Sequence, residues 1–372
     1  MAKTIYFVAG EASGDSHGAA LMRALHSLDE SARFLGRGGP KMRARAGADF
    51  IDWNEHAAVL GLWEVVKQYG YFRREFAATV AQIEQQQPDA VVLIDYPGFN
   101  LRLARALRTR LPRLKIIYYI SPQVWAWNRR RIPQMARYLD LMLCIFPFEA
   151  ELYNQSGLRT IFVGHPMVET LGPKKSGDAR DPNLVGLFPG SRMREIRKIL
   201  PPMLVAEKQI THTRPDVRFE IAAATAALQR AIETMLTGSG LNATVTCESA
   251  ASLMQRAQVG IVASGTATLE AAFFGLPFVL VYRVAWLTYV AAKLVVKVKH
   301  LGMPNVLAGR KIVPEFIQHQ ARPDAIARAV LRLLDDTTYR NEMVANFEGV
   351  IAKLGRGGAS EAAARAILRE IS

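Results

Sequence analysis

The chain has 372 residues, of which 50% are hydrophobic and 22% are charged, so it can bury a large core and is not disordered throughout. A chain of this length predicts two domains. Lysine and arginine number 47 against 33 acidic residues, and the excess of 14 indicates a nucleic acid, an anionic membrane or a phosphorylated substrate as partner. The basic residues are spread along both halves, so no detachable basic tail explains them.

Cysteines and histidines argue against a disulfide framework and a metal site. Cys144 and Cys247 lie far apart in apolar stretches, which fits a reducing compartment. The seven histidines form no metal-binding motif. The first apolar run is too short for a signal peptide, and later ones are interrupted by charges such as Lys293. We expect a soluble or membrane-peripheral protein of the cytoplasm.

The first half alternates short apolar runs with amphipathic ones, which is typical of an α/β protein with a parallel sheet. Helices are predicted at 101–111 and 148–155. The segment 167–183 is rich in glycine, proline and lysine and predicts an interdomain linker. The predicted strands are 4–9, 33–35, 90–95, 115–120, 139–146 and 160–163.

The second half repeats this alternation, so two Rossmann-like, doubly wound domains are predicted at 1–166 and 184–350, facing across a cleft. The last segment, 351–372, is expected to form a helix that packs back on the first domain. Such sheets bind ligands beyond the carboxyl ends of their strands. The predicted strands are 184–188, 218–223, 243–247, 259–263 and 278–282, and the helices are 191–211, 226–236, 266–274, 325–335 and 360–371.

The motif GEASGD (10–15) follows the first predicted strand, and its glycines allow a tight turn and close approach of a ligand. Taken alone, it is more simply an ordinary strand-to-helix turn. It matches neither the dinucleotide fingerprint, the P-loop nor the hydrolase nucleophile elbow.

Asp95, in the motif IDYPGFN (94–100), ends a nearly all-apolar strand. Doubly wound folds place chemistry there, and a carboxylate with apolar neighbours can serve as a general base. An aspartate that only caps a helix or hydrogen-bonds to a loop backbone is equally compatible with the sequence.

The next motif, ISPQVWAW (120–127), precedes arginines 129–131. This set suits phosphorylated or sugar ligands or single-stranded nucleic acid, and the alternative is a packed aromatic loop.

Two motifs of the second half join a strand to a helix. In PGSR (189–192), helix amides and an arginine would form a phosphate site, although Ser191 can instead be a helix N-cap. In ASGTATLE (263–270), small residues suit a diphosphate, and Glu270 suits ribose hydroxyls. A capping box from Thr266 fails because position 269 is leucine, which favours a functional role for Glu270.

The segments PNVLAG (304–309) and PEFIQ (314–318) supply Asn, Glu and Gln side chains suited to sugar and diphosphate contacts. By themselves they predict an ordinary loop between helices. Two further stretches, 59–74 and 285–299, mix aromatic and aliphatic residues with lysine or arginine. Helices of this composition can lie on an anionic bilayer. Helices buried in the core or at a domain interface have the same composition at least as often.

Together these motifs, with LGLWEV (60–65), resemble the lipid A disaccharide synthases, glycosyltransferases of Gram-negative lipopolysaccharide biosynthesis. The resemblance spans most of the chain in consistent order. It implies a GT-B architecture and an inverting reaction without cofactor or dedicated metal. The substrates it implies are UDP-2,3-diacylglucosamine and 2,3-diacylglucosamine 1-phosphate, and the products are a β-1,6-linked disaccharide 1-phosphate and UDP. It also implies the cytoplasmic face of the inner membrane, and family members can associate as homo-oligomers.

The resemblance also implies roles for residues at the matching positions. Asp95 is the first choice as base, and Arg192 would stabilise the charge of the leaving UDP. Which carboxylate is the base stays open. The remaining assignments are donor contacts (Gly190, Ser191, Gly265, Thr266, Glu270, Asn305, Gln318), acceptor or orienting groups (Glu11, Ser13, Asp15, Trp125, Glu315) and acyl or membrane contacts (Leu62, Trp63, Val65, Val66, Trp286, Tyr289).

Other functions remain as alternatives. Another UDP-sugar enzyme of the same fold, such as an N-acetylglucosaminyl transferase or a UDP-sugar epimerase, is the nearest, and GEASGD and ISPQVWAW argue against it. A basic nucleic-acid-binding module is the second, but no nucleic-acid motif is present and acidic residues are interspersed with basic ones.

Overall fold

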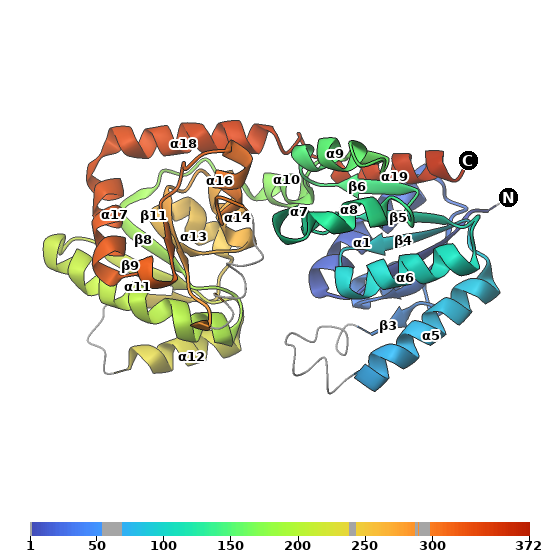
Figure 1. Cartoon of the computed structure of the whole chain (residues 1–372). Helices are drawn as coiled ribbons and strands as arrows, with labels where there is room; N and C mark the ends of the chain where they lie inside the picture. The colour runs from blue at the N-terminus through green and yellow to red at the C-terminus, as the bar shows by residue number, and fades with distance from the viewer. Residues whose placement is uncertain (1, 54–68, 238–242, 287–288, 290–297) are drawn as a thin grey trace. The chain divides into compact units, whose positions relative to one another are not determined.

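The chain forms two compact units in the computed structural model, which describes residues 2–53, 69–237, 243–286, 289 and 298–372. The first unit combines Met1–Glu169 with Leu354–Ser372, and the second is Thr170–Lys353. In each unit helices cover a parallel β-sheet (Figure 1). The predicted α/β class with two doubly wound sheets is confirmed.

The sheet of the first unit has seven strands in the order β3-β2-β1-β4-β5-β6-β7, all paired in parallel. The order reverses between β1 and β4, which is the switch point where such sheets bind ligands. The strands are β1 (Thr4–Ala9), β2 (Arg33–Gly38), β3 (Ile51–Asp52), β4 (Ala90–Ile94), β5 (Lys115–Tyr119), β6 (Leu141–Cys144) and β7 (Thr160–Phe162).

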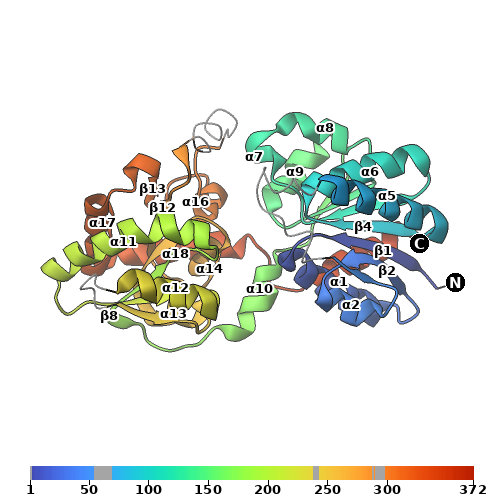
Figure 2. The ribbon, with the colours of Figure 1, turned by 90° about the horizontal axis from the view of Figure 1, so that it is seen from below.

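Helices cover both faces of this sheet because alternate strand residues point to opposite sides. On β1, Ile5 and Phe7 join one core, and Tyr6 and Val8 join the other. Figure 2 shows α1 and α2 on one side of the sheet and α5 and α6 on the other. The helices are α1 (Ala12–Leu28), α2 (Pro40–Ala46), α5 (Tyr69–Gln86), α6 (Pro97–Arg110), α7 (Val124–Trp127), α8 (Ile132–Met135), α9 (Pro147–Asn154), α10 (Pro166–Leu171) and α19 (Ala359–Glu370).

The last helix, α19, belongs to the first unit although it ends the chain. It packs against α1, and Ala363 and Ile367 lie in the same core as Ile5 and Phe7. Lys115 on β5 and Arg159 both pair with the carboxylate of Glu370. Apolar burial and these ion pairs together attach the C-terminal helix to this unit.

The sheet of the second unit has six parallel strands in the order β10-β9-β8-β11-β12-β13, with its switch point between β8 and β11. The strands are β8 (Asp181–Phe188), β9 (Arg218–Ala222), β10 (Ala243–Thr246), β11 (Ala257–Ala263), β12 (Phe278–Tyr282) and β13 (Glu315–Ile317). The helices are α11 (Met193–Thr213), α12 (Ala226–Leu236), α13 (Ala250–Arg256), α14 (Thr266–Phe273), α16 (Met303–Ala308), α17 (Pro323–Asp335) and α18 (Thr337–Ala352).

Several boundaries differ from the predictions for reasons visible in the contacts. The strand expected from residue 184 begins at Asp181, inside the predicted linker, because Asp181 pairs with Ala257 of β11. The segment from Met303 was predicted as a loop, and this is wrong: it begins the helix α16, with a proline in its first turn. The edge strand β13 has three residues and was not predicted either.

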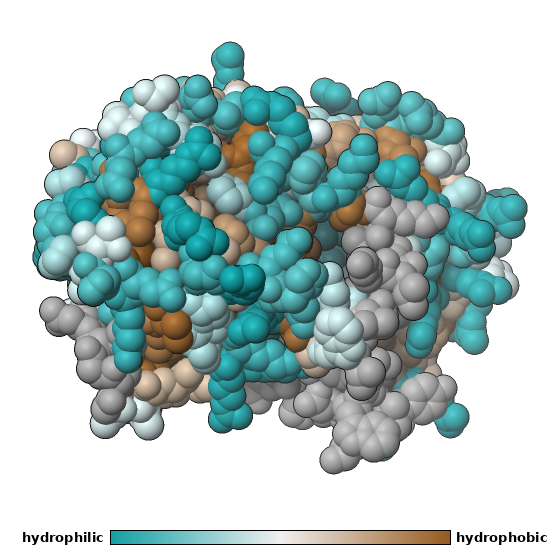
Figure 3. Space-filling model, turned by 60° about the vertical axis from the view of Figure 1, so that its left-hand side comes forward, coloured by the Kyte–Doolittle hydropathy of each residue, from teal (hydrophilic) through white to brown (hydrophobic). Residues whose placement is uncertain are grey.

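No helix within the described residues is long and apolar enough to cross a bilayer. The face of the molecule in Figure 3 is mostly hydrophilic, with apolar residues in smaller patches. Among the described side chains, Trp286 is a large apolar group that is 64% exposed.

Candidate active site

The second unit contains a cavity of about 590 Å³ at the switch point of its sheet, beyond the carboxyl ends of β8 and β11. Cavities of this size accommodate ligands of drug or nucleotide size. The structure brings six of the predicted donor residues together in its wall: Gly190, Ser191, Arg192, Gly265, Thr266 and Glu270.

Two helices begin at this cavity and direct their amino ends to it. The N-cap of α11 is Arg192 and the N-cap of α14 is Gly265, so each helix starts within two residues of the start expected from sequence. Gly190 has φ +115° and Gly265 has φ +150°, a backbone region in which a Cβ is strained. The amides of the first helical turns and the two helix dipoles favour an anionic ligand at these amino ends, and three carboxylates, Glu195, Glu248 and Glu270, line the same cavity.

The carboxylate of Glu195, which sequence reasoning did not select, already engages the donors of this wall. One oxygen accepts a hydrogen bond from the Ser191 amide at 3.3 Å, and the other pairs with the Arg192 guanidinium at 3.1 Å. A carboxylate therefore takes the contacts that we predict for a diphosphate. An incoming diphosphate must compete with Glu195 for these donors.

We expect Glu195→Gln to bind UDP about two- to fivefold more tightly than the wild type, because an exposed ion pair that competes with the ligand is weakened. Isothermal titration calorimetry with UDP measures this, and Glu233→Gln on α12 is the matched control. Weaker UDP binding by Glu195→Gln would instead make Glu195 part of the binding wall.

The cavity lining also contains residues that the sequence did not single out as ligand contacts. Ala222 ends β9 and is followed by Ala223 and Ala224, and Cys247–Ala250 follow β10 and lead into α13. Cys247 ends the strand predicted at 243–247, but in the structure it follows β10 and is exposed in the cavity lining. The available signal was positional, since both segments follow strands of one sheet at its carboxyl edge.

Burial raises the pKa of Glu270, and the Lys174 charge partly opposes this. The side chain is half-buried in the first turns of α14, where it lines the cavity. Glu270 therefore lines the same cavity as Arg192, and its contact with a ribose stays a prediction.

Asn305 and Glu315 hold the segment after β12 together. Asn305 is fully buried, and its amide oxygen accepts from the Ile312 and Val313 backbone amides. Glu315 accepts from the Asn305 amide group and the Gly302 backbone. These contacts differ from the predicted ligand contacts, because the polar atoms are used to connect α16 to β13.

Gln318 bonds to the backbone of Val284 in both directions, at 3.0 and 2.9 Å. It sits at φ +54°, a conformation that costs energy for a residue with a side chain. Gln318 thus holds the segment that carries Trp286 and Tyr289. The rings of Trp286 and Tyr289 lie 5.9 Å apart, and the predicted membrane residues Leu62, Trp63, Val65 and Val66 lie outside the described residues.

In the first unit, Asp95 follows β4 at the switch point of its sheet. Burial raises its pKa to about 6, and the neighbouring Glu11 charge adds to this. Asp95 and Tyr96 have φ +44° and +51°, and two successive strained residues of this kind are found mostly at functional sites. The Asp95 carbonyl accepts hydrogen bonds from Tyr118 and Asn100, which hold this backbone in place.

The GEASGD loop supplies Glu11 next to Asp95 and requires glycine at position 10. A Cβ on Gly10 would come within 2.4 Å of the Tyr96 ring. Asp15 instead anchors α2, because it is 2% exposed and accepts hydrogen bonds from the Gly39, Lys41 and Met42 amides. Ser13 is exposed on the first turn of α1.

Trp125 is 5% exposed and donates its indole N–H to Glu149 at 2.8 Å. Glu149 is fully buried on α9, also accepts from the Phe146 amide, and was not predicted. Tyr153, one turn on, donates to the Pro122 carbonyl. The aromatic loop is therefore packed and fastened to α9, while Trp127 is 39% exposed beneath the Arg131 guanidinium.

Burial raises the pKa of Glu149 to about 7, against 4.5 for a solvated glutamate. The folded state thus keeps a proton that the unfolded state loses, so stability is fully present below pH 4.5 and decreases as the pH rises through 7. We expect the titration of Glu149 to lower the free energy of unfolding by up to about 3 kcal/mol between pH 5 and pH 8. Urea unfolding of the wild type and Glu149→Gln across this range measures it.

The exposed neighbour Glu151 supplies the control for this experiment, because Glu151→Gln removes a carboxylate from the same helix. We expect its stability to follow the pH dependence of the wild type. Equal pH dependence in Glu149→Gln and the wild type would contradict the assignment.

Among the described residues, no group of three or more His, Cys, Asp or Glu side chains is arranged to hold a metal ion.

Two parallel-sheet α/β units, with a cavity at the switch point of the second that receives two helix amino ends, place the chain in the GT-B structural class. The solved UDP-GlcNAc 2-epimerase of Neisseria meningitidis has this fold, with a TM-score of 0.63 and 14% identity over 99% of this chain and 100% of that one. The glycotransferase of kitacinnamycin has a TM-score of 0.64 and 15% identity, with 100% of each chain covered.

A family model for lipid-A-disaccharide synthetase matches residues 5–368. A relative from Geobacter sulfurreducens named lipid-A-disaccharide synthase is 41% identical, with 98% of this chain and 96% of the relative covered. One from Acidobacterium capsulatum is 40% identical, with 96% and 94% covered. The chain belongs to the lipid-A-disaccharide synthase family, and it is a glycosyltransferase. The family resemblance read from the motifs is confirmed.

Proposed function

We propose that the protein transfers 2,3-diacylglucosamine from UDP to the 6-hydroxyl of 2,3-diacylglucosamine 1-phosphate, with inversion at the anomeric carbon. The family to which the chain belongs supports glycosyl transfer to the lipid A disaccharide. The observation that carries the donor assignment is the cavity with two helix amino ends, Arg192 and Glu270 in its wall. These are the groups that a nucleoside diphosphate needs for its phosphates and ribose.

Inversion requires a single displacement, in which the acceptor hydroxyl attacks the anomeric carbon while the bond to UDP breaks. One base takes the hydroxyl proton, and we assign this role to Asp95. Its raised pKa makes it a better proton acceptor than an ordinary aspartate near neutral pH. Arg192 and the amino ends of α11 and α14 stabilise the negative charge that develops on UDP.

Mass-spectrometric assay of the purified protein tests this function. With UDP-2,3-diacylglucosamine and 2,3-diacylglucosamine 1-phosphate, we expect a β-1,6-linked disaccharide 1-phosphate and UDP in equal amounts. The alternative activity is epimerisation of UDP-GlcNAc, because a UDP-GlcNAc 2-epimerase has the same fold. The same preparation is therefore also incubated with UDP-GlcNAc. Epimerised UDP-GlcNAc without disaccharide product would reject the proposal.

Membrane contact is part of the proposal because both substrates carry acyl chains. We propose that the protein is peripheral on the cytoplasmic face of the inner membrane, with segments 59–74 and 285–299 near lipid. The support is their composition together with the exposed Trp286 and the adjacent Tyr289.

We expect combined replacement of Leu62, Val65 and Val66 by serine to weaken vesicle binding or to raise the KM for the lipid substrates several-fold, since apolar area is removed. Flotation with anionic vesicles and steady-state kinetics measure this. Thr79→Ser, within α5, serves as the unaffected control. If neither quantity changes, the first segment has no lipid contact.

A further inference from the structure

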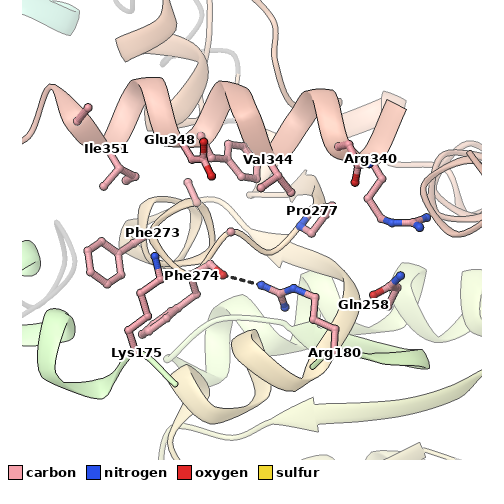
Figure 4. A pocket seen from close by; sticks show the side chains of 15 residues that line it. Lys175, Arg180, Gln258, Phe273, Phe274, Pro277, Arg340, Val344, Glu348 and Ile351 are labelled. Atoms are coloured by element: carbon pink, nitrogen blue, oxygen red, sulfur yellow. Dashed lines mark hydrogen bonds between the residues drawn. The ribbon is translucent and has the colours of Figure 1, made fainter. Parts of the chain in front are cut away.

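The second unit has another cavity, of about 660 Å³, at the amino ends of its strands. The nucleotide-sized cavity lies at the carboxyl ends of the same sheet. The lining of the cavity at the amino ends includes Arg180 and Pro277, which immediately precede β8 and β12, and Gln258, the second residue of β11. Figure 4 shows α18 above it and the end of α14 below. All of its lining residues belong to one compact unit.

One wall of this cavity is formed by apolar side chains of α18. Val344, Phe347 and Ile351 recur at intervals of three and four along α18, so they form a stripe about 10 Å long on one helix face. Phe273 and Phe274, at the end of α14, lie across from them (Figure 4). A stripe of this length fits an extended alkyl chain better than a compact ring.

Three cations line the same cavity, and none forms an ion pair with a described carboxylate. Arg180 donates to the carbonyls of Met254, Ala257 and Phe274. Arg340 donates to carbonyls at the end of α17, and the Lys175 ammonium lies 5.8 Å from the Phe273 ring centre. The single acidic residue of the lining, Glu348, is exposed, so the cavity has a net positive charge.

Arg180 shows how strongly this charge lacks a counterion. Burial lowers its pKa to about 10, which means that its charged form is disfavoured where it lies. Carbonyl groups satisfy its N–H donors but supply no negative charge. An anion in the cavity would stabilise the guanidinium ion and would itself be held by charge-assisted contacts.

We propose that this cavity binds an organic phosphate carrying one alkyl chain, with the chain along the α18 stripe and the phosphate near Arg180 and Lys175 (Figure 4). Neither the nucleotide site nor Asp95 contributes to this cavity. The proposal therefore does not depend on the proposed reaction.

Binding of decyl phosphate below its micelle concentration, measured by isothermal titration calorimetry on the full chain, tests the proposal. We expect one saturable site in the wild type. Inorganic phosphate and decanol should each bind at least about tenfold more weakly, because each lacks one half of the interaction. Decyltrimethylammonium should not bind.

Variants locate the site. We expect Val344→Trp to weaken decyl phosphate binding at least about tenfold by filling the cavity, and Lys175→Gln to weaken it about fivefold by removing a cation. Ala345→Trp on the outer face of α18 and Lys208→Gln on α11 are the matched controls and should bind as the wild type does. Thermal unfolding confirms that each variant is folded.

If Val344→Trp does not fold, Ala352→Trp replaces it, since Ala352 lines the cavity but is exposed. Three results would overturn the proposal. They are the absence of saturable binding to the wild type, equal affinity for decanol and decyl phosphate, and binding that neither the tryptophan nor the Lys175 variant weakens.

Discussion

Asp95→Asn is expected to lower kcat at least about a hundredfold, because the amide cannot accept the proton of the acceptor hydroxyl. Asparagine is the informative substitution at this position. It tolerates the positive φ of Asp95 better than alanine does, so the strained turn survives. The Tyr118 and Asn100 bonds to the Asp95 carbonyl do not involve the side chain and also remain. Steady-state kinetics with both lipid substrates measure the effect.

The pH dependence of the reaction identifies the base more directly than the size of the loss. Because the pKa of Asp95 is about 6, kcat/KM should fall about tenfold per pH unit below that value and level off above it. The residual kcat/KM of Asp95→Asn should not show this fall at acidic pH, which is the acid limb of the pH profile. Asp89→Asn, at the other end of β4, is the control and keeps the limb. Near wild-type turnover in Asp95→Asn would remove Asp95 as the base and direct attention to Glu11.

Arg192→Ala is the second substitution with a large expected effect, a loss of at least about a hundredfold in kcat/KM. The guanidinium is at the N-cap of α11, where the charge on departing UDP develops in our proposal. Arg192→Lys should recover part of the loss, since it keeps the charge but not the two-pronged geometry. UDP binding should weaken about tenfold in Arg192→Ala, as expected for a lost charged hydrogen bond.

Arg197→Ala provides the control for Arg192, since Arg197 is exposed one turn further along α11 and lies outside the cavity wall. It should behave as the wild type. Arg192→Ala also leaves Glu195 without its guanidinium partner. The double variant Arg192→Ala with Glu195→Gln separates the two effects. If its kcat/KM is as low as that of Arg192→Ala alone, the whole loss is due to Arg192. A single Arg192→Ala variant with full activity would exclude a role in stabilising UDP.

Apolar periodicity was sufficient to predict most of the fold. The strand at Thr4–Ala9 and the helix at Ala226–Leu236 begin and end at the predicted residues, because each combines a clear pattern with turn residues at its ends. The edge strand Glu315–Ile317 has only three half-buried residues. Its strand conformation comes from pairing with Leu280–Tyr282, which no local pattern encodes.

The candidate site divides in the same way. Local motifs placed Gly190–Arg192 and Gly265–Glu270 after strands, and parallel strands end at one edge, so their meeting in one cavity could be expected. The hydrogen bonds and ion pair that Asn305, Asp15 and Glu195 make within the protein could not be predicted. A polar side chain looks the same in sequence whether it holds a ligand, a backbone amide or a neighbouring guanidinium. Long-range contacts made that choice for each of them.

The sequence by itself determined the family, two α/β halves and the strand-end motifs, because these depend on residue order and periodicity. The tertiary structure decided which polar groups face a cavity and which are used internally. It buries Asp95 and Glu149 enough to raise the pKa of each, and it places three cations without carboxylate partners among the described residues beside an apolar stripe. Burial and charge pairing arise between segments far apart in the chain, so only the folded structure specifies them.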